Sequence, residues 1–546
     1  MINFSKKNLK TKIIEFTIVK NGTKGIYYVE LLFKRRLVHI DARSLLTMLM
    51  IALVACVQSG CQNQKEQKAM ALYESHCARC HLAPNREDLP KEIWENAILP
   101  DMAARMGLRE NKYDPFAGLS YEEMDAVIKT GIYPFSPTIS QSDWQLLKAY
   151  ILAGAPDSLS AASGTTGSSE LEDFFPLQIS IDKENPRSYT YLEYIPSLNK
   201  VYLGDMAGEL MTFDLNSGMK ILDRYDSPVV SYNTEHNESF ITTIGNIHPS
   251  AIPLGKVLKC SATDSVEIAS ILHRPVHTLV EDLNSDGIEE LVISEFGNLT
   301  GALSLLIRDQ QGNYDKKILL NQPGAIRILA KDMDNDGKKD LIVLTSQGDE
   351  SITILFQKSA LSFEAKKVLR FSPIYGSSWF ELLDYDADGD LDLVTVHGDN
   401  ADKSYVQKPY HGMRLHLNDG ENNFKEVFFY PMDGATRVVA SDFDMDGDVD
   451  FGLLSTFPDY TTAAYRSFVF LKNTNSEAYE FKAFTTEAAT KGKWFLMDSG
   501  DIDNDWDTDI ILSSFALPFI PAPKELIEEW KEEAIDLMIL QNTFNN

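Results

Sequence analysis

Basic residues are scarce relative to acidic residues in this sequence of 546 residues. It contains 51 Lys and Arg against 80 Asp and Glu, which gives a formal net charge of −29. Nucleic acid is therefore not an expected partner, because contacts with phosphates need a basic face. A disordered acidic chain is also excluded, since hydrophobic residues make up 44% of the sequence. The length indicates two or more domains.

Cysteine is scarce too, with five in the chain, and only Cys77 and Cys80 form a CxxC pair. A zinc ribbon needs a second pair of this kind and is excluded. The sequence contains no nucleophile-elbow, P-loop or dinucleotide-binding fingerprint. No catalytic motif therefore identifies an enzyme, and the sequence leaves that question open.

The apolar run at residues 45–57 follows the basic residues 34–36 and Arg43 and is about thirteen residues long. This length suits the core of a signal peptide and is short for a membrane span. Residues 53–56 of the run read LVAC, which resembles the lipobox of bacterial lipoproteins and implies lipidation at Cys56. Cys61 is the alternative. Residues 1–56 are thus expected to be an export signal with an over-long start. The mature protein would be extracytoplasmic, in the periplasm or at the cell surface, and anchored to the membrane by lipid.

What the sequence has in abundance is one acidic loop, which recurs five times from residue 282 onward. The copies begin 50 to 59 residues apart and read DLNSDGIEEL, DMDNDGKKDL, DYDADGDLDL, DFDMDGDVDF and DIDNDWDTDI. Oxygen ligands at positions 1, 3, 5 and 9 of a tight loop suit Ca²⁺. These residues are Asp282, Asn284, Asp286 and Glu290; Asp332, Asp334, Asp336 and Asp340; Asp384, Asp386, Asp388 and Asp392; Asp442, Asp444, Asp446 and Asp450; and Asp501, Asp503, Asp505 and Asp509.

The loops are not EF-hands, because position 12 never carries an acid and short apolar β-rich runs follow. About five Ca²⁺ ions are therefore expected. The last copy is the weakest, since Trp506 takes the place of the glycine at position 6.

The rest of each repeat predicts four strands, which is one blade of a β-propeller. Residues 173–546 are expected to form seven blades, with residues 173–182 supplying the closing strand of the last one. The pattern resembles the FG-GAP/VCBS repeat propellers, closely over 276–546 and loosely over 175–275. That resemblance implies that the acidic loops bind Ca²⁺ and make the blades rigid.

The second motif is CARCH, from Cys77 to His81. Two thiols at this spacing bind a haem covalently, and the following histidine supplies an axial iron ligand. Residues 65–156 are expected to form a small helical domain that resembles a class I cytochrome c with a single haem. Met102, Met106 and Met124 are candidates for the second axial ligand. Met102 is favoured because Pro100 is expected to break the helix before it. Residues 157–172 are expected to be a flexible linker.

One loop of the propeller, residues 397–416, is longer than a hairpin needs and is rich in polar side chains. It predicts a polar pocket at the propeller axis that contains Asp399, Asn400, His411 and Arg414, suited to carbohydrate. The alternative is that these residues only hold the loop in shape.

Three functions remain open at this stage. The first is an exported haem c protein that transfers electrons to a redox partner protein and uses the calcium-stabilised propeller as a partner- or glycan-binding platform. The second is a sugar-type dehydrogenase or dehydratase coupled to the haem. The third is a surface adhesion or binding lipoprotein.

Overall fold

The computed structural model describes residues 13–20, 23–30, 64–110, 113–160, 169–236, 238–261, 263–401, 405–516 and 521–544. The chain divides into two compact units, residues 1–68 and 69–546. In the first unit, strands β1 (Ile13–Lys20) and β2 (Thr23–Glu30) form an antiparallel hairpin. Cys56 and Cys61, the candidate lipidation sites, lie outside the described residues. Within the described residues, no helix is both long and apolar enough to cross a membrane.

The segment that carries the CARCH motif is helical, as expected. A helix at residues 64–77 leads into the motif. The helices that follow are η1 (Arg86–Asp88), α2 (Lys91–Ile93), η2 (Trp94–Ile98), α3 (Leu99–Arg105), α4 (Tyr121–Thr130) and α5 (Gln141–Gly154). Helices α4 and α5 begin at serines whose hydroxyl groups accept a backbone N–H of the first turn, which satisfies one donor that the helix leaves unpaired.

The expectation that Pro100 breaks the helix is wrong. The chain stays helical from α2 through the π-helical turn η2 into α3, and the Leu99 N–H donates to the Trp94 carbonyl. Pro100 follows the wide π turn directly, and this turn accommodates a residue that has no N–H to donate. Met102 therefore lies on a continuous helix.

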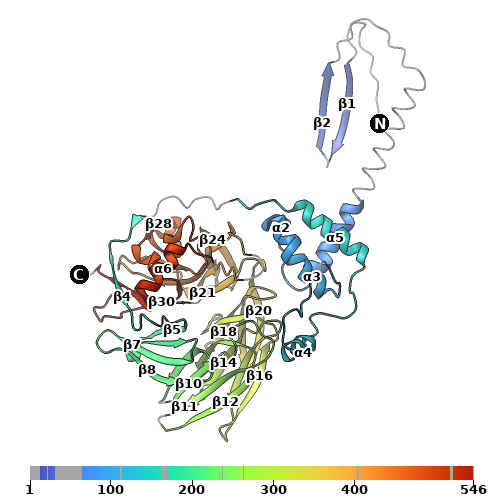
Figure 1. Ribbon diagram of the computed structural model, residues 1–546. Coiled ribbons are helices and arrows are strands. Elements are labelled where there is room, and N and C mark those ends of the chain that lie inside the picture. Colours follow the sequence, from blue (N-terminus) through green and yellow to red (C-terminus); the bar gives the residue numbers. More distant parts are fainter. Residues whose placement is uncertain are drawn as a thin grey trace. The chain divides into compact units, whose positions relative to one another are not determined.

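Within residues 69–546, the strands from residue 169 onward form a β-propeller of seven blades (Figure 1). The first five blades are antiparallel sheets of four strands in sequence order, and the sixth and seventh each add a strand from before the first blade. Strands of the first three blades are β5 (Tyr189–Ile195), β6 (Lys200–Asp205), β7 (Glu209–Asp214), β8 (Gly218–Arg224); β9 (Val229–Glu235), β10 (Glu238–Thr243), β11 (Gly255–Cys260), β12 (Ser265–Leu272); β13 (Pro275–Glu281), β14 (Glu290–Glu295), β15 (Ala302–Arg308) and β16 (Tyr314–Leu320).

The fourth to sixth blades follow the same order. Their strands are β17 (Ala325–Lys331), β18 (Asp340–Thr345), β19 (Ser351–Ser359), β20 (Ser362–Arg370); β21 (Ser377–Leu383), β22 (Asp392–His397), β23 (Gly412–Asn418), β24 (Phe424–Pro431); β25 (Ala435–Ser441), β26 (Asp450–Ser455), β27 (Phe468–Asn475) and β28 (Glu480–Thr485). The second strand of these blades is almost fully buried, which its continuous apolar sequence predicts.

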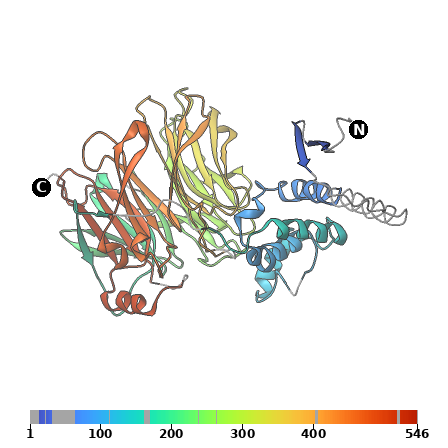
Figure 2. The ribbon, with the colours of Figure 1, turned by 90° about the horizontal axis from the view of Figure 1, so that it is seen from above.

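The seventh blade confirms the expected closure of the ring. Strands β29 (Trp494–Gly500), β30 (Asp509–Ser514) and β31 (Leu537–Asn542) come from the end of the chain, and β4 (Phe174–Ile179) pairs with β31. The strand β3 (Ser169–Glu170), within the predicted linker, pairs with β28, and Leu171 after it is buried. Helix α6 (Lys524–Glu533) lies at the edge of the blades (Figure 2).

The first strands β5, β9, β13, β17, β21, β25 and β29 contact one another in this order, and β29 contacts β5. They are therefore the inner ring around the propeller axis. The acidic loops join first and second strands, at the end of the blade opposite the connections between second and third strands.

Candidate metal centres

The five acidic loops, residues 282–290, 332–340, 384–392, 442–450 and 501–509, share one backbone conformation. Position 4 has a positive φ in all five loops, from 55° to 68°. Position 6 has a positive φ of 83° to 97° where it is glycine, and 77° at Trp506. Two left-handed residues separated by one residue turn the chain sharply, so side chains at positions 1, 3 and 5 face the inside of the loop.

Carboxylates at positions 1 and 5 hold this conformation. In the second loop, the N–H groups of Asp336 and Gly337 donate to Asp332, at 3.2 and 2.9 Å, and the Lys338 N–H donates to Asp336 at 3.0 Å. The fourth loop repeats this pattern with the corresponding residues. Each loop thus aims its carboxylates by local hydrogen bonds before any ion binds.

The acid at position 9 is the first residue of the second strand and is at most 2% exposed in every loop. One oxygen of Asp340 accepts the Met333 N–H from the loop at 2.9 Å, and the other accepts the Gln357 N–H from β19 at 2.7 Å. Asp392 and Asp509 make the same pair of bonds with their own loop and third strand. This carboxylate therefore ties the loop to the body of the blade.

Burial, followed by repulsion from the other loop carboxylates, raises the pKa of the position-9 acids. The pKa reaches about 7 for Glu290 and Asp450 and about 6 for Asp392 and Asp509. Hydrogen bonds from backbone N–H groups oppose the shift. A bound cation would relieve the repulsion, so the electrostatics of the loops favour a positive ion.

Four of the five loops bring three carboxylate oxygens within 4.8 Å of one another. The residues are Asp332, Asp334 and Asp336; Asp384, Asp386 and Asp392; Asp442, Asp444 and Asp450; and Asp501, Asp503 and Asp505. The first loop has Asn284 at position 3 and is not among these groups. Carboxylate oxygens with backbone support are the donors that Ca²⁺ takes, so the residues fit this ion.

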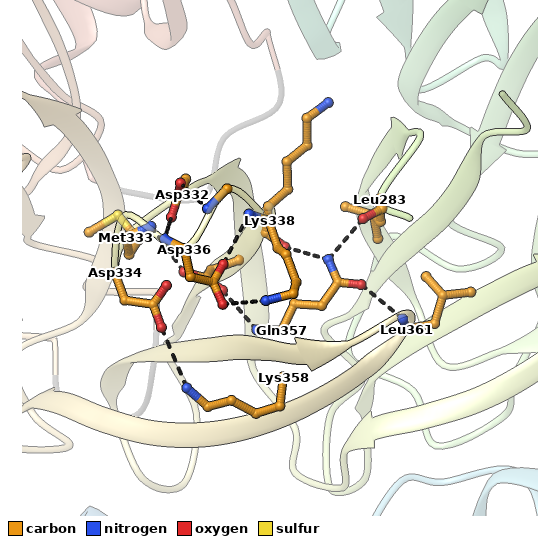
Figure 3. Close-up of polar contacts among 12 residues, drawn as sticks. Leu283, Asp332, Met333, Asp334, Asp336, Lys338, Gln357, Lys358 and Leu361 are labelled. Carbon is orange, nitrogen blue, oxygen red and sulfur yellow. Dashed lines mark hydrogen bonds and ion pairs between the residues drawn. The ribbon is translucent and has the colours of Figure 1, made fainter. Parts of the chain in front are cut away.

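Lysines approach the same carboxylates. Lys358 from β19 lies 3.5 Å from Asp334, and Lys338 lies 2.5 Å from Asp336 (Figure 3). Lys472 forms an ion pair with Asp444 in the fourth loop. These ammonium groups offset part of the negative charge of the loops. Their positions show that positive charge is favoured beside the carboxylates at positions 3 and 5.

Three of the loops are also fastened to the following blade, which the sequence did not reveal. The side-chain amide of Gln357 donates to the Leu283 carbonyl of the preceding loop at 2.8 Å (Figure 3). Asn422 donates to the Met333 carbonyl at 2.6 Å, and Asn542 donates to the Phe443 carbonyl at 2.7 Å. The position-2 carbonyl of three loops is thus paired across a blade boundary.

The residues expected to hold haem lie on the helical segment. Cys77 is half-buried and Cys80 is exposed, and both are free thiols. His81 is half-buried, and its Nδ1 lies 2.9 Å from the Leu82 carbonyl. Cys77, Met102 and Met106 all pack against one apolar cluster that includes Trp94, Trp144 and Leu147. Burial raises the pKa of the Cys77 thiol to about 11.

Most polar side chains among the described residues of loop 397–416 are buried. Asn400 accepts the Lys408 ammonium at 2.6 Å and donates to the Val406 carbonyl at 2.9 Å. Arg414 stacks on Phe429 and Tyr375, and His411 is 1% exposed. Asp399 is exposed. The structure therefore places Asn400, His411 and Arg414 inside the loop and Asp399 on its surface.

This loop also contacts the helical segment. The Tyr410 hydroxyl donates to the Asp88 carbonyl at 2.9 Å, and Val406 and Tyr410 pack against the apolar cluster around Trp144. In the second blade, the Ser250 hydroxyl donates to Glu123 of α4 at 2.7 Å. These contacts come from the ends of the blades opposite the acidic loops.

Sequence reasoning missed two groups of residues. Glu235, His236 and Glu289 lie together on neighbouring blades, but His236 is largely exposed. Arg327, Trp379 and Arg437 lie on three inner strands. In the sequence they are recognisable only by their position, because each is the third residue of its first strand.

Residues 332–395 match the model of the FG-GAP-like repeat family. A comparison with curated proteins finds no match. Among solved structures, the WD40 domain of Neurospora crassa Pan2 is 12% identical with a TM-score of 0.39, covering 64% of this chain and 94% of that chain. The N-terminal domain of Nup159 is 12% identical with a TM-score of 0.39, covering 70% and 99%. The match to the FG-GAP-like repeat lies within the propeller, and the matched residues span two whole acidic loops.

Proposed function

We propose that this protein is an exported electron-transfer protein in which a calcium-stabilised propeller serves as a binding platform for a partner protein or a glycan. The observation that carries the role of the propeller is the set of five acidic loops with positive φ at the same two positions, four of which gather three carboxylate oxygens. The FG-GAP-like repeat at residues 332–395 supports it. Calcium would stabilise the platform and take no part in any reaction.

The Ca²⁺ ions would be held by positions 1, 3, 5 and 9 of each loop. The loops supply acids that are already aimed inward, so the ion adds attraction without having to reorganise the backbone. Since unfolding would destroy the loop, binding energy becomes folding energy. The propeller should therefore depend on Ca²⁺ for stability.

The haem would be held by thioether bonds to Cys77 and Cys80, with His81 as one axial ligand and Met102 or Met106 as the other. When bound, haem supplies a one-electron carrier whose potential depends on its axial ligands. The support is the CARCH motif and the packing of Cys77, Met102 and Met106 around one apolar cluster. The side chains of that cluster would exclude water from one face of the group.

Export and a lipid anchor at Cys56 complete the proposal. Covalent haem and calcium loops of moderate affinity both suit an extracytoplasmic setting. The protein would then lie in the periplasm or at the cell surface, attached to the membrane, where it exchanges electrons with a redox partner protein.

Two measurements test the proposal. Replacing Cys77 and Cys80 by alanine should abolish the covalent pyridine-haemochrome signal of the denatured protein, and a normal signal in the double variant would refute haem attachment. Chelation of Ca²⁺ should lower the melting temperature of the propeller while the transition of the helical segment stays in place. Equal melting in calcium and chelator would refute the metal sites.

The rival hypothesis of a haem-coupled enzyme is tested by the same sample. A dehydrogenase that acts on a sugar would reduce its own haem when substrate is added, whereas an electron-transfer protein would need a partner. Reduction by a sugar without any added protein would favour the enzyme.

A further inference from the structure

The inner strands of the propeller carry a repeated irregularity. In all seven first strands, the register with the second strand shifts near the start of the strand. Such β-bulges re-aim side chains and are frequent next to functional sites. The residues directly after the shift are Tyr191, Ser231, His277, Arg327, Trp379, Arg437 and Leu496.

Electrostatic interactions across the ring indicate that Arg327 and His277 lie near the axis together with acidic side chains of other inner strands. Arg327 of the fourth blade acts on Glu193 of the first blade and on His277 of the third. Asp498 of the seventh blade interacts with Glu193 and with Glu381 of the fifth. Charges on blades this far apart in the ring interact only if they point inward.

Three of the residues form a stack. The guanidinium carbons of Arg327 and Arg437 lie 3.8 and 4.4 Å from the centroid of the Trp379 ring. The indole N–H donates to Glu381 at 2.7 Å, and Nη2 of Arg327 donates to both oxygens of Glu381 at 2.8 Å. The ring and Arg327 are therefore fixed in place by one carboxylate.

Arg437 is different, because none of the described carboxylates forms an ion pair or a hydrogen bond with it, although the negative charge of Asp399 acts on it and raises its pKa. Its one hydrogen bond goes from Nη1 to the carbonyl of the adjacent Thr436, at 2.8 Å. Burial and the neighbouring Arg327 lower its pKa to about 10, so it remains charged at neutral pH. The Nε and Nη2 atoms of Arg437 have no hydrogen-bond partner among the described residues. They are not among the fully buried polar atoms, so they border water. An arginine held on an aromatic ring with donors to spare is arranged to bind an anion.

We propose that Arg437, supported by Trp379 and Arg327, binds the carboxylate group of a small organic acid at the propeller axis. A planar carboxylate matches the guanidinium fork and needs one positive charge. A phosphate would carry more charge beside Glu193, Glu381 and Asp498 and would be repelled. A sugar ring would need a free face of Trp379, and two guanidinium groups already lie against that ring.

The inference goes beyond the proposed role of the propeller as a platform for a partner protein or a glycan, and it depends on neither haem nor the acidic loops. The test uses the full chain in calcium. Acetate, L-lactate, inorganic phosphate and glucose are titrated separately by calorimetry into the wild-type protein and into Arg437→Gln. Arg466→Gln is the matched control, because Arg466 also lies over an aromatic ring, Tyr430, but away from the axis.

Acetate or lactate should bind to the wild-type protein and to Arg466→Gln, and affinity should fall about tenfold or more in Arg437→Gln, as expected for loss of a charged hydrogen-bond donor. Equal affinity in Arg437→Gln, no carboxylate binding to the wild-type protein, or preferential binding of phosphate or glucose would overturn the inference.

A second measurement uses only the wild-type protein, so it does not depend on whether Arg437→Gln folds. Crystals of the wild-type protein are soaked in 4-bromobenzoate, and the anomalous signal of bromine locates the ligand. Bromine near Arg437 supports the site, and bromine only elsewhere overturns it. Haem content and calcium dependence are measured on the same preparation. If both are normal while no carboxylate binds, the axial site fails and the proposed function stands.

Discussion

Replacing Trp506 by glycine should stabilise the propeller. Trp506 occupies position 6 of the last acidic loop with a φ of 77°, where the four other loops have glycine. A residue with a Cβ in this left-handed conformation costs roughly 1–2 kcal/mol. Glycine increases the entropy of the unfolded chain, which offsets roughly 0.4–1 kcal/mol of that gain.

The net expectation is a gain of about 1 kcal/mol in the free energy of unfolding. The indole contributes little to set against it, because Trp506 is 87% exposed. Its backbone N–H, 3.3 Å from Asp501, is kept in the variant. The assay is urea unfolding of the full chain in saturating Ca²⁺, with the midpoint of the propeller transition compared at equal slope.

The reciprocal change tests the reasoning. Gly447 holds the same position in the fourth loop with a φ of 97°, and a Cβ there would meet no atom within 4 Å. Gly447→Ala should therefore destabilise by about 1 kcal/mol through backbone strain alone. If Trp506→Gly lowers stability, or if both variants shift the midpoint in the same direction, the strain argument is refuted and the exposed indole must have a stabilising contact.

Three further predictions concern buried polar groups. Asn542→Leu should lower the free energy of unfolding by about 1–3 kcal/mol, because it leaves the Phe443 carbonyl unpaired. The control Asn423→Leu changes an exposed residue and should be nearly neutral; equal effects of the two variants in urea unfolding would contradict a stabilising hydrogen bond between the blades. Burial raises the pKa of Glu350 to about 8, above its usual value of 4.5, so between these pH values the native state holds a proton that the unfolded chain loses. The free energy of unfolding should therefore fall as the pH rises from 4.5 to 8, and Glu350→Gln should make this pH dependence weaker. An unchanged pH dependence in Glu350→Gln would show that Glu350 is ionised in the folded protein. His411→Ala should lower stability by about 1–3 kcal/mol because the ring is buried, and unchanged stability with weaker binding of a carbohydrate would instead favour the pocket predicted from the sequence.

The seven blades could be predicted from the sequence because their signals are local. Each acidic loop places its carboxylates by hydrogen bonds within about nine residues, and the apolar run that follows is a buried strand. The closing strand was predictable as well, since the last blade lacked one and residues 173–182 had strand character. Repetition made each local signal stronger, because the same pattern had to hold in every copy.

The tertiary structure alone decided what each loop is attached to. The second oxygen of Asp340 accepts an N–H from β19, and the Leu283 carbonyl is paired by Gln357 from the next blade. Spacing within one repeat contains no information about which side chain of another repeat will face it. The same holds for the helix through Pro100, where a π turn replaced the expected break.

The axis shows the difference between sequence and structure most clearly. Arg327, Trp379 and Arg437 are more than 50 residues apart from one another in sequence, and each is an ordinary polar or aromatic residue of an inner strand. They meet because the ring closes and because a bulge in each first strand aims them inward. The sequence by itself determined the repeat, its loops and the number of blades, since these depend on local hydrogen bonds and burial. Which charges share the axis was decided only by closure of the ring, which brings seven distant strands together.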